Sequence, residues 1–462
     1  MPTESRTEQL LNAYINGDDI SNFVPLSRNE QILKDMILGN EQTSSPQSRI
    51  ESLYKKLDEK IKNSSGSDIN TLQYVIDNKN GDGKPSCASL FRDYKGTNLD
   101  IISQCDFSKV TDMNNMFSCC SNLTTIPLLD TSNVTDMQYM FYSCSKLTTI
   151  PQLDTSSCTR ICYMFNYCSN LTTIPLLDTS NVTDMQYMFS GCSSLTTIPQ
   201  LNTRKNKLMY YMFNGCSKLT TIPQLDTSSC TNMSYMFNGC SNLITIPQLD
   251  TSSCTSMSYM FSGCSNLTTI PQLDTSKVTN MYRMFNGCSK LTTIPQLDTS
   301  KATNMESMFS YCPKLTTIPQ LDTSNINCTN NMFNNCFKLT TIPQLDMSKV
   351  TYASYMFTNC EALTYLKLLN VKINLQIGSG TSWGHLIEKD CLIQIISELI
   401  KPSSGTRTLT MGTANKAKIA DTYVKLLADD GTGKYPFEVC ESTDEGAMTI
   451  EAYCNSKNWT LA

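Results

Sequence analysis

The feature that most constrains this fold is a Met-Phe pair that recurs every 24 residues, from Met116 and Phe117 to Met356 and Phe357. The pair belongs to a unit close to L-T-T-I-P-Q-L-D-T-S-x-V-T-x-M-x-x-M-F-x-x-C-S-x, with eleven copies over residues 106–370. A fixed period of this length is typical of a solenoid, in which each unit stacks on its neighbours. One copy buries too few apolar side chains to offset the entropy of ordering it, so stacking is obligatory.

The pattern inside one copy predicts a short strand and a short arc that close on each other. The strand is expected at residues 147–153, where Thr-rich sequence favours β structure and Pro151 keeps the strand short. Asp154 then begins a turn. Val134 and Met137, with the apolar positions that follow at intervals of three or four, indicate one buried face of a helical or 3₁₀ arc. The sequence therefore predicts an α/β solenoid of short parallel strands and short helical or 3₁₀ arcs.

Short helices are expected before the repeats. Ser5, Ser27 and Ser48 each begin an S-R-x-E segment, the capping-box arrangement in which a serine caps a helix and a glutamate three residues later bonds back. Helices this short are marginal alone, so we expect them to fold on a partner or in a homo-oligomer through residues 1–62.

The remaining sequence gives a domain organisation in which caps cover the two ends of the repeat array. A Ser/Gly-rich linker follows the helical anchor. The C-terminal cap is expected to hold a helix near 390–400, a strand near 408–411 and a second helix near 414–428. The expected boundaries are 1–62 for the anchor, 63–68 for the linker, 69–105 for the N-terminal cap, 106–370 for the repeats and 371–462 for the C-terminal cap.

Charge and hydropathy exclude several classes of partner. Only 17% of the residues are charged and the net charge is −5, which gives no basic field for a nucleic acid. No run approaches the roughly 18 to 20 apolar residues needed to cross a bilayer, so we expect no membrane insertion. Residues 1–11 lack the basic and apolar regions of a secretory signal, which predicts a protein made in the cytoplasm.

The positions of the cysteines indicate a role in core packing more than a role in redox or metal chemistry. Eleven of the 22 occupy one position of the repeat, and an odd number at one position cannot all pair with each other. A buried, small apolar thiol explains them better than a redox or metal array. His385 is the one histidine, and no paired C-x-x-C ligands accompany it, so we expect no metal, no cofactor and no enzyme activity.

Two polar ladders also have structural interpretations. The repeated aspartates, such as Asp130 and Asp154, are expected to cap local backbone N–H groups. The Thr-Thr pairs, such as Thr124 and Thr125, would point to opposite faces of a strand and leave one exposed file, which argues against an ice-binding surface.

The candidate binding residues precede the Met-Phe pairs. This position varies, with Arg283, Ser307 and Asn331 in three copies, as an outward position would. Exposed tyrosines can stack on sugar rings or pack against a protein, although the alternative is that they pack along the arc and shield backbone. The candidate ligand-binding ladder is Tyr139, Tyr163, Tyr187, Tyr211, Tyr235, Tyr259 and Tyr355.

The run M-F-x-x-C-S-x-L-T-T-I-P resembles the BspA-type branch of leucine-rich-repeat surface proteins over residues 106–370. The resemblance implies a right-handed leucine-rich-repeat solenoid used for adhesion or recognition. The pattern P-x-S-R-x-E at Pro25 and Pro46 resembles N-terminal segments of bacteriophage virion proteins, and L-T-M-G at 409–412 with K-N-W-T-L-A at 457–462 is similar to the terminal cap of such proteins.

These resemblances lead to two functional hypotheses. The first is a non-enzymatic phage structural protein, fibre-like or decorating, located in the virion. Its N-terminal helices would bind a virion structural protein, and its solenoid would recognise a host cell-surface protein or glycan. The alternative is a cell-associated BspA-like adhesin or scaffold protein of a bacterium or protist.

Overall fold

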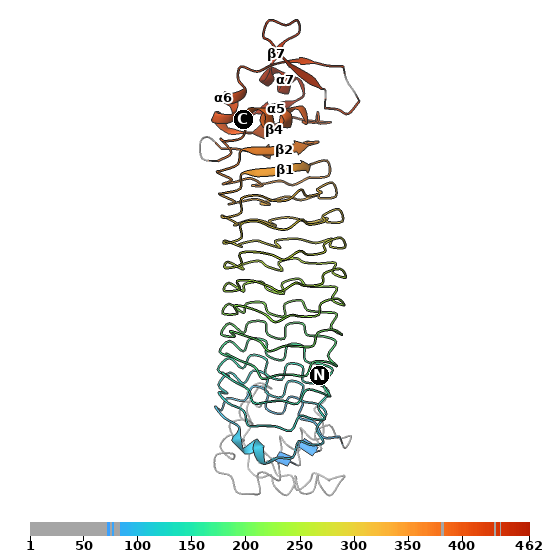
Figure 1. Cartoon of the computed structure of the whole chain (residues 1–462), viewed down its shortest axis with the longest axis vertical. Helices are drawn as coiled ribbons and strands as arrows, with labels where there is room; N and C mark the ends of the chain where they lie inside the picture. Colours follow the sequence, from blue (N-terminus) through green and yellow to red (C-terminus); the bar gives the residue numbers. More distant parts are fainter. Residues whose placement is uncertain (1–71, 74–75, 78–83, 380–382, 429–430, 435) are drawn as a thin grey trace, which may run out of the picture. The chain divides into compact units, whose positions relative to one another are not determined.

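The fold was analysed in a computed structural model that describes residues 72–73, 76–77, 84–379, 383–428, 431–434 and 436–462. The predicted anchor at 1–62 and linker at 63–68 lie outside these residues. The chain divides into two compact units. Unit 1 consists of Met1–Leu208 and Gly215–Leu219, and unit 2 of Met209–Asn214 and Thr220–Ala462. Both are repeat solenoids, in which successive turns of the backbone lie on one another (Figure 1).

The apolar residues of each repeat form ladders inside the units, as the period predicts. In unit 1, Val134, Met137 and Met140 have no exposed surface. Phe117 stacks on Phe141 with ring centroids 5.5 Å apart. The phenylalanine ladder of unit 2 has the same geometry, with neighbouring centroids 5.7 to 6.0 Å apart. Each phenylalanine therefore packs on its copies above and below, which a single repeat could not provide.

The predicted helical or 3₁₀ arcs are wrong, because the segment is a series of β-turns. The N–H of Met140 donates to the Met137 carbonyl at 3.2 Å, and the N–H of Cys144 donates to the Phe141 carbonyl at 3.1 Å. Tyr139 and Ser143, the third residues of these turns, have φ of 56° and 58°. A right-handed helix cannot contain such left-handed residues, whereas type II turns require one at the third position.

The predicted strand at 147–153 is also absent as a regular strand. Pro151 has no N–H to donate, so the backbone ladder is interrupted there. The N–H of Thr172 still reaches the Thr148 carbonyl of the previous repeat at 3.0 Å. At the end of the repeats in unit 2, β1 (Thr341–Asp346) and β2 (Tyr365–Leu369) do form a parallel pair, with a register shift between Ile342 and Leu345.

At its N-terminal side, unit 1 continues the repeat pattern into the predicted cap. The N–H of Phe91 donates to the Met116 carbonyl at 2.9 Å, and the Phe91 ring stacks on Phe117 at 5.8 Å. The 3₁₀ helix η2 (Asp100–Gln104) follows and buries Ile101 and Ile102. Repeat-like bonding thus begins before residue 106.

Among its described residues, the C-terminal part of unit 2 contains two small sheets and three helices. One sheet is parallel, in the order β3 (Leu375–Gln376), β4 (Arg407–Thr410) and β8 (Trp459–Leu461). The other is antiparallel, in the order β6 (Phe437–Cys440), β5 (Tyr423–Leu426) and β7 (Met448–Thr449). The helices are α5 (Lys389–Ser397), α6 (Gly412–Ile419) and α7 (Ile450–Ser456).

Two of the three elements expected here lie where the sequence placed them, namely α5 and β4. The second predicted helix, at 414–428, is right only in its first half, because α6 ends at Ile419 and residues 423–426 form β5. Tyr423 and Val424 favour β structure, and β5 pairs with both β6 and β7. Among the described residues, the helices are all too short or too polar to cross a membrane.

Candidate functional site: the outward files of the repeats

The predicted tyrosine ladder is half-buried along most of its length. Six members are only partly exposed, and Tyr355 is the exception at 62% exposure. In unit 1 the ring centroids of Tyr139 and Tyr163 lie 4.5 Å apart, as do those of Tyr163 and Tyr187. In unit 2 the spacing is 4.2 Å from Tyr211 to Tyr235 and 4.3 Å from Tyr235 to Tyr259.

The stacking decides what these rings can bind. Their planes lie within 15° of parallel, so each ring covers a face of the next. A sugar cannot stack on a covered face, which leaves the ring edges and hydroxyl groups as the outward surface. The geometry within these runs fits the alternative interpretation, in which the tyrosines pack along the arc.

The tyrosine run of unit 2 ends at a cation. The guanidinium carbon of Arg283 lies 5.6 Å from the Tyr259 ring centroid and 5.2 Å from that of Tyr282. Burial, followed by a hydrogen bond with Tyr259, raises the pKa of Tyr282 to about 12. The Tyr282 phenol therefore stays protonated at neutral pH and presents a neutral hydroxyl group.

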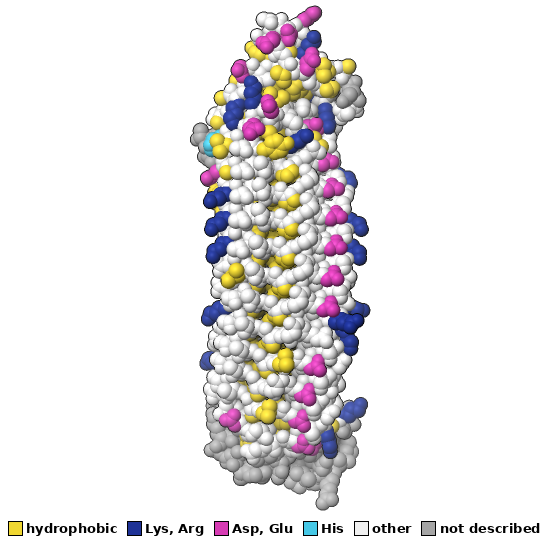
Figure 2. Space-filling view, viewed as in Figure 1, with side chains coloured by type: hydrophobic (Ala, Val, Ile, Leu, Met, Phe, Trp, Pro, Cys, Tyr) yellow, Lys and Arg dark blue, Asp and Glu magenta, His cyan; other side chains and the backbone are white. Residues whose placement is uncertain are grey.

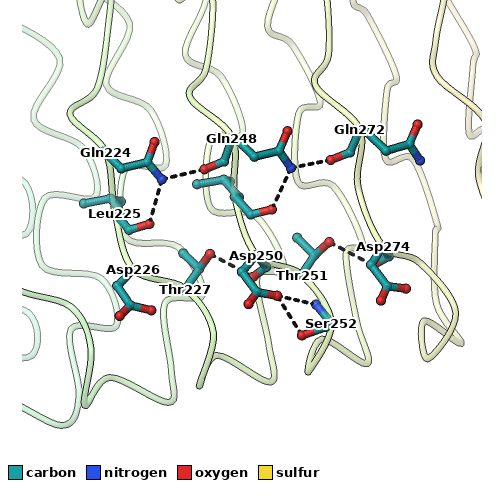
Figure 3. Close-up of a pocket in the computed structure, with 11 residues that line it drawn as sticks. Gln224, Leu225, Asp226, Thr227, Gln248, Asp250, Thr251, Ser252, Gln272 and Asp274 are labelled. Carbon is teal, nitrogen blue, oxygen red and sulfur yellow. Dashed lines mark hydrogen bonds between the residues drawn. The ribbon is translucent and has the colours of Figure 1, made fainter.

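A second outward file consists of glutamine side chains that replace the missing backbone ladder. The Gln248 amide nitrogen donates to the Leu249 carbonyl at 3.1 Å and to the Gln272 carbonyl of the next repeat at 2.6 Å. Gln224 makes the same pair of bonds (Figure 3). Gln272 does so as well, with Leu273 and Gln296. The amide N–H groups are thus used in hydrogen bonds within the protein, whereas the amide oxygens of Gln248 and Gln272 point outward.

The aspartates form a third file, parallel to the glutamines. An Oδ1 atom of Asp250 accepts bonds from the Ser252 N–H at 3.0 Å and from the Ser252 hydroxyl at 2.7 Å, which confirms the predicted capping role. These bonds lower the pKa of Asp250, so the carboxylate remains charged. Figure 2 shows acidic side chains in lines beside hydrophobic ones.

Glutamines and aspartates together line a shallow open groove in unit 2, shown in Figure 3. Thr227 and Thr251 bridge consecutive repeats there, each donating its hydroxyl to the aspartate carbonyl of the next repeat at 2.8 Å. Because the donors are used within the protein, the groove presents mainly acceptor oxygens and negative charge. The groove consists of Gln224, Leu225, Asp226, Thr227, Gln248, Leu249, Asp250, Thr251, Ser252, Gln272 and Asp274.

The Thr-Thr pairs differ from expectation. Thr124 and Thr125 are both exposed, so the prediction that adjacent threonines point to opposite faces is wrong. The segment is not a regular strand, and strict alternation therefore does not apply. In several repeats the first hydroxyl of the pair is used structurally, as when Thr172 Oγ1 donates to the Thr148 carbonyl at 3.1 Å.

The cysteine ladder is buried in the core, as predicted. The thiol of Cys264 donates to the Phe237 carbonyl at 3.1 Å, and the same bond recurs from repeat to repeat. Burial raises the pKa of the Cys288 thiol to about 12, so it is protonated and unreactive at neutral pH. In the part of the chain that the structure describes, no group of three or more His, Cys, Asp or Glu side chains is arranged to hold a metal ion.

Sequence reasoning missed the most exposed apolar side chains. Leu128 and Leu176 stand in the glutamine file and are 69% and 63% exposed. Tyr167 and Tyr311 precede the buried cysteines and are also exposed. The signal in the sequence was departure from the consensus, since the same positions elsewhere hold glutamine or small residues such as Gly215.

The buried ladders and stacked turns define the class of protein as a repeat solenoid. The chain belongs to the family described as "Mycoplasma protein of unknown function, DUF285". The family model matches residues 85–197, 146–243, 170–272, 207–316 and 255–370, which together span more than half of the chain. No curated protein matches the sequence.

Several solved structures are similar to the chain, although with low scores. One is a leucine-rich repeat protein of T. pallidum, with 19% identity and a TM-score of 0.30, covering 36% of this chain and 76% of that one. Another is a leucine-rich repeat protein from Bacteroides ovatus, with 19% identity and a TM-score of 0.29, covering 60% and 82%. A third, from Eubacterium ventriosum, has 16% identity and a TM-score of 0.32, covering 63% and 83%.

Proposed function

We propose that this chain is a non-enzymatic recognition module that binds a surface partner through the outward files of its repeats. The observation that carries the proposal is the groove of unit 2. There the Gln248 amide N–H groups and one Asp250 oxygen form hydrogen bonds within the protein, and the remaining acceptor oxygens face outward. A surface with this chemistry complements a partner rich in donors and positive charge. Recognition in this form requires no catalytic residue.

The groove can be tested by photo-crosslinking with the full chain. A photoreactive phenylalanine in place of Gln248 should crosslink to a partner on intact cells, because this side chain lies in the groove. The matched control carries the same residue in place of Lys290, which is exposed outside the groove. Adding Asp250→Asn and Asp274→Asn should weaken the crosslink through lost charge complementarity. Equal crosslinking from both positions would show that the groove has no special role.

The setting of this module has two candidates, each with its own support. The resemblance of the S-R-x-E segments and of the C-terminal residues to phage proteins supports a virion component, anchored through residues 1–62. The description of the matched family, which mentions mycoplasmas, supports the alternative of a cell-associated adhesin or scaffold. In either setting the proposed partner is a protein or glycan on a cell surface.

Mass spectrometry separates the two settings. Density-purified phage particles from the host should contain the intact chain if it is a virion protein, and a variant lacking residues 1–62 should be missing from them. Recovery of the chain in the cell envelope fraction, with none in particles, would contradict the virion setting and favour the cellular one.

A further inference from the structure

Two tyrosines of unit 1 depart from the consensus of the repeat. Tyr167 directly precedes a buried cysteine, has a φ of 60° and is 55% exposed. The same position in following repeats holds glycine, as in Gly191, Gly215 and Gly239, for which positive φ carries no penalty. The fold does not require tyrosine at this position, because glycine, serine and asparagine occupy it in other repeats, and an exposed aromatic ring gains little from burial.

The second tyrosine, Tyr142, packs edge-to-face against the Tyr167 ring. The Tyr142 ring centroid lies 6.3 Å from that of Tyr167 with the ring planes at 89°, and 5.8 Å from that of Tyr139 with the planes at 64°. Tyr142 also departs from the consensus, since Asn166 and Ser190 follow the phenylalanine in the next repeats. We call Tyr142 and Tyr167 the aromatic corner.

The glycine of the next repeat supports the Tyr167 ring. A Cβ atom on Gly191 would lie 2.7 Å from Cδ1 of Tyr167, closer than side chains tolerate. The ring therefore lies against the backbone of Gly191, which fixes its position while more than half of its surface stays open to solvent. A fixed ring with an open surface is a preorganised platform, unlike the covered rings of the tyrosine ladder.

Serines that follow the corner tyrosines in the sequence can accept hydrogen bonds from a hydroxyl ligand. Ser145 lies three residues after Tyr142 and Ser169 two residues after Tyr167, and their hydroxyls donate to carbonyls of the previous repeat at 3.4 Å. Ser193 makes the same bond at 3.1 Å. Since their protons are used in this way, the serine oxygens are left as acceptors for donors on a ligand.

We propose that the aromatic corner is a carbohydrate-binding site, an inference that rests on the proposed recognition function and names one of its ligands. The C–H groups on one face of a pyranose ring carry partial positive charge and stack on the negative face of an aromatic ring. Hydroxyl groups at the rim of the sugar then donate to the serine oxygens. The corner side chains carry no charge, so a neutral sugar fits better than a phosphate or a charged peptide.

The test is binding of the purified full chain to an array of immobilised oligosaccharides. The wild-type chain should bind a subset of the array, and Tyr142→Asn with Tyr167→Gly should lower that affinity by about tenfold or more, because the stacking platform is removed. Both replacements are residues that other repeats hold at these positions, such as Asn214 and Gly215, so the double variant should keep the melting temperature of the wild type.

Tyr311 provides the matched control. It occupies the Tyr167 position in another repeat and is 60% exposed, but Asn286 stands where Tyr142 does and Asn335 where Gly191 does. Tyr311→Gly should therefore leave sugar binding unchanged. Equal losses in the two variants, or a double variant that binds the array like the wild type, would overturn the proposal, as would a wild-type chain that binds no sugar.

Cell binding separates failure of this site from failure of the proposed function. Periodate treatment, which destroys cell-surface sugars, should lower binding of the wild-type chain to cells to the level of the double variant. If cell binding survives periodate but is lost after protease treatment, the partner is a protein and the carbohydrate site is wrong while the recognition function stands. If the chain binds neither the array nor cells, both proposals fail.

Discussion

At the residue scale, left-handed backbone recurs at fixed positions of the repeat. Tyr139 and Ser143 both have left-handed backbone, and that conformation lays the Tyr139 ring against its copy in the next repeat. The 24-residue period correctly predicted which residues stack, since stacked residues share a position in the repeat. The period also supports the alternative that the candidate tyrosines pack along the arc, whereas it could not predict their left-handed backbone, because residue spacing carries no information on φ.

The buried thiols predict a loss of stability at alkaline pH. Burial raises the pKa of Cys168 and of Cys336 from an ordinary 9.0 to about 12. A raised pKa means that the thiol's contribution is fully present below pH 9 and is lost as the pH rises toward 12. The melting temperature should therefore fall steadily above pH 9, and less steeply in Cys168→Ala. A melting temperature that stays constant to pH 11 would contradict this assignment.

At the element scale, glutamine side-chain amides replace the backbone hydrogen bonds that proline interrupts. Pro151 lacks an N–H, and the Gln152 amide reaches the Leu176 carbonyl of the next repeat at 2.7 Å instead. The sequence indicated a strand here because threonines and branched apolar residues favour one. It did not indicate that side-chain amides would supply the bonds, since a glutamine in a repeat is equally consistent with a solvent-exposed position.

Removing one of these amides should weaken the stack measurably. Gln248→Ala loses two donated bonds, to Leu249 and to the next repeat, and should lower the free energy of unfolding by about 1 kcal/mol. Lys290→Ala, an exposed change outside the groove, should alter it by less than about 0.5 kcal/mol. Urea unfolding of the two variants tests this difference. Equal free energies of unfolding would show that the glutamine file does not contribute to stability.

The last helix depends on a cap that can be removed in the same way. The hydroxyl of Thr449 accepts a bond from the Ala452 N–H at 3.2 Å and caps α7. Thr449→Ala should cost about 1 kcal/mol of stability, whereas Thr449→Ser should keep most of it, because serine caps equally well. If both variants melt like the wild type, α7 is held by its packing alone.

At the scale of the whole molecule, the sequence predicted the repeat solenoid and its buried ladders, whereas the tyrosine ladder stays a prediction for the binding surface. The candidate tyrosines were chosen because one repeat position varies. The aromatic corner that we propose as a further site, Tyr142 and Tyr167, breaks the consensus at positions where other repeats hold small or amide residues. A consensus describes what folding requires, so departures from it are where function can be sought.

The anchor prediction also belongs to this scale. Residues 1–62 precede the repeats and lie outside the described part of the chain. If they serve only for attachment, a variant that begins at residue 63 should show the same melting temperature as the full chain by circular dichroism. A large fall in melting temperature would show that these residues stabilise the repeats and would contradict a purely anchoring role.

The measurement that tests the recognition function most directly is flow cytometry of intact cells, from the organism in which the gene occurs, incubated with the fluorescently labelled full chain. We expect saturable binding that unlabelled chain competes away and that heat-unfolded chain does not show. Binding that fails to saturate, or that unfolded chain reproduces, would contradict a recognition module built on the outward files of the repeats.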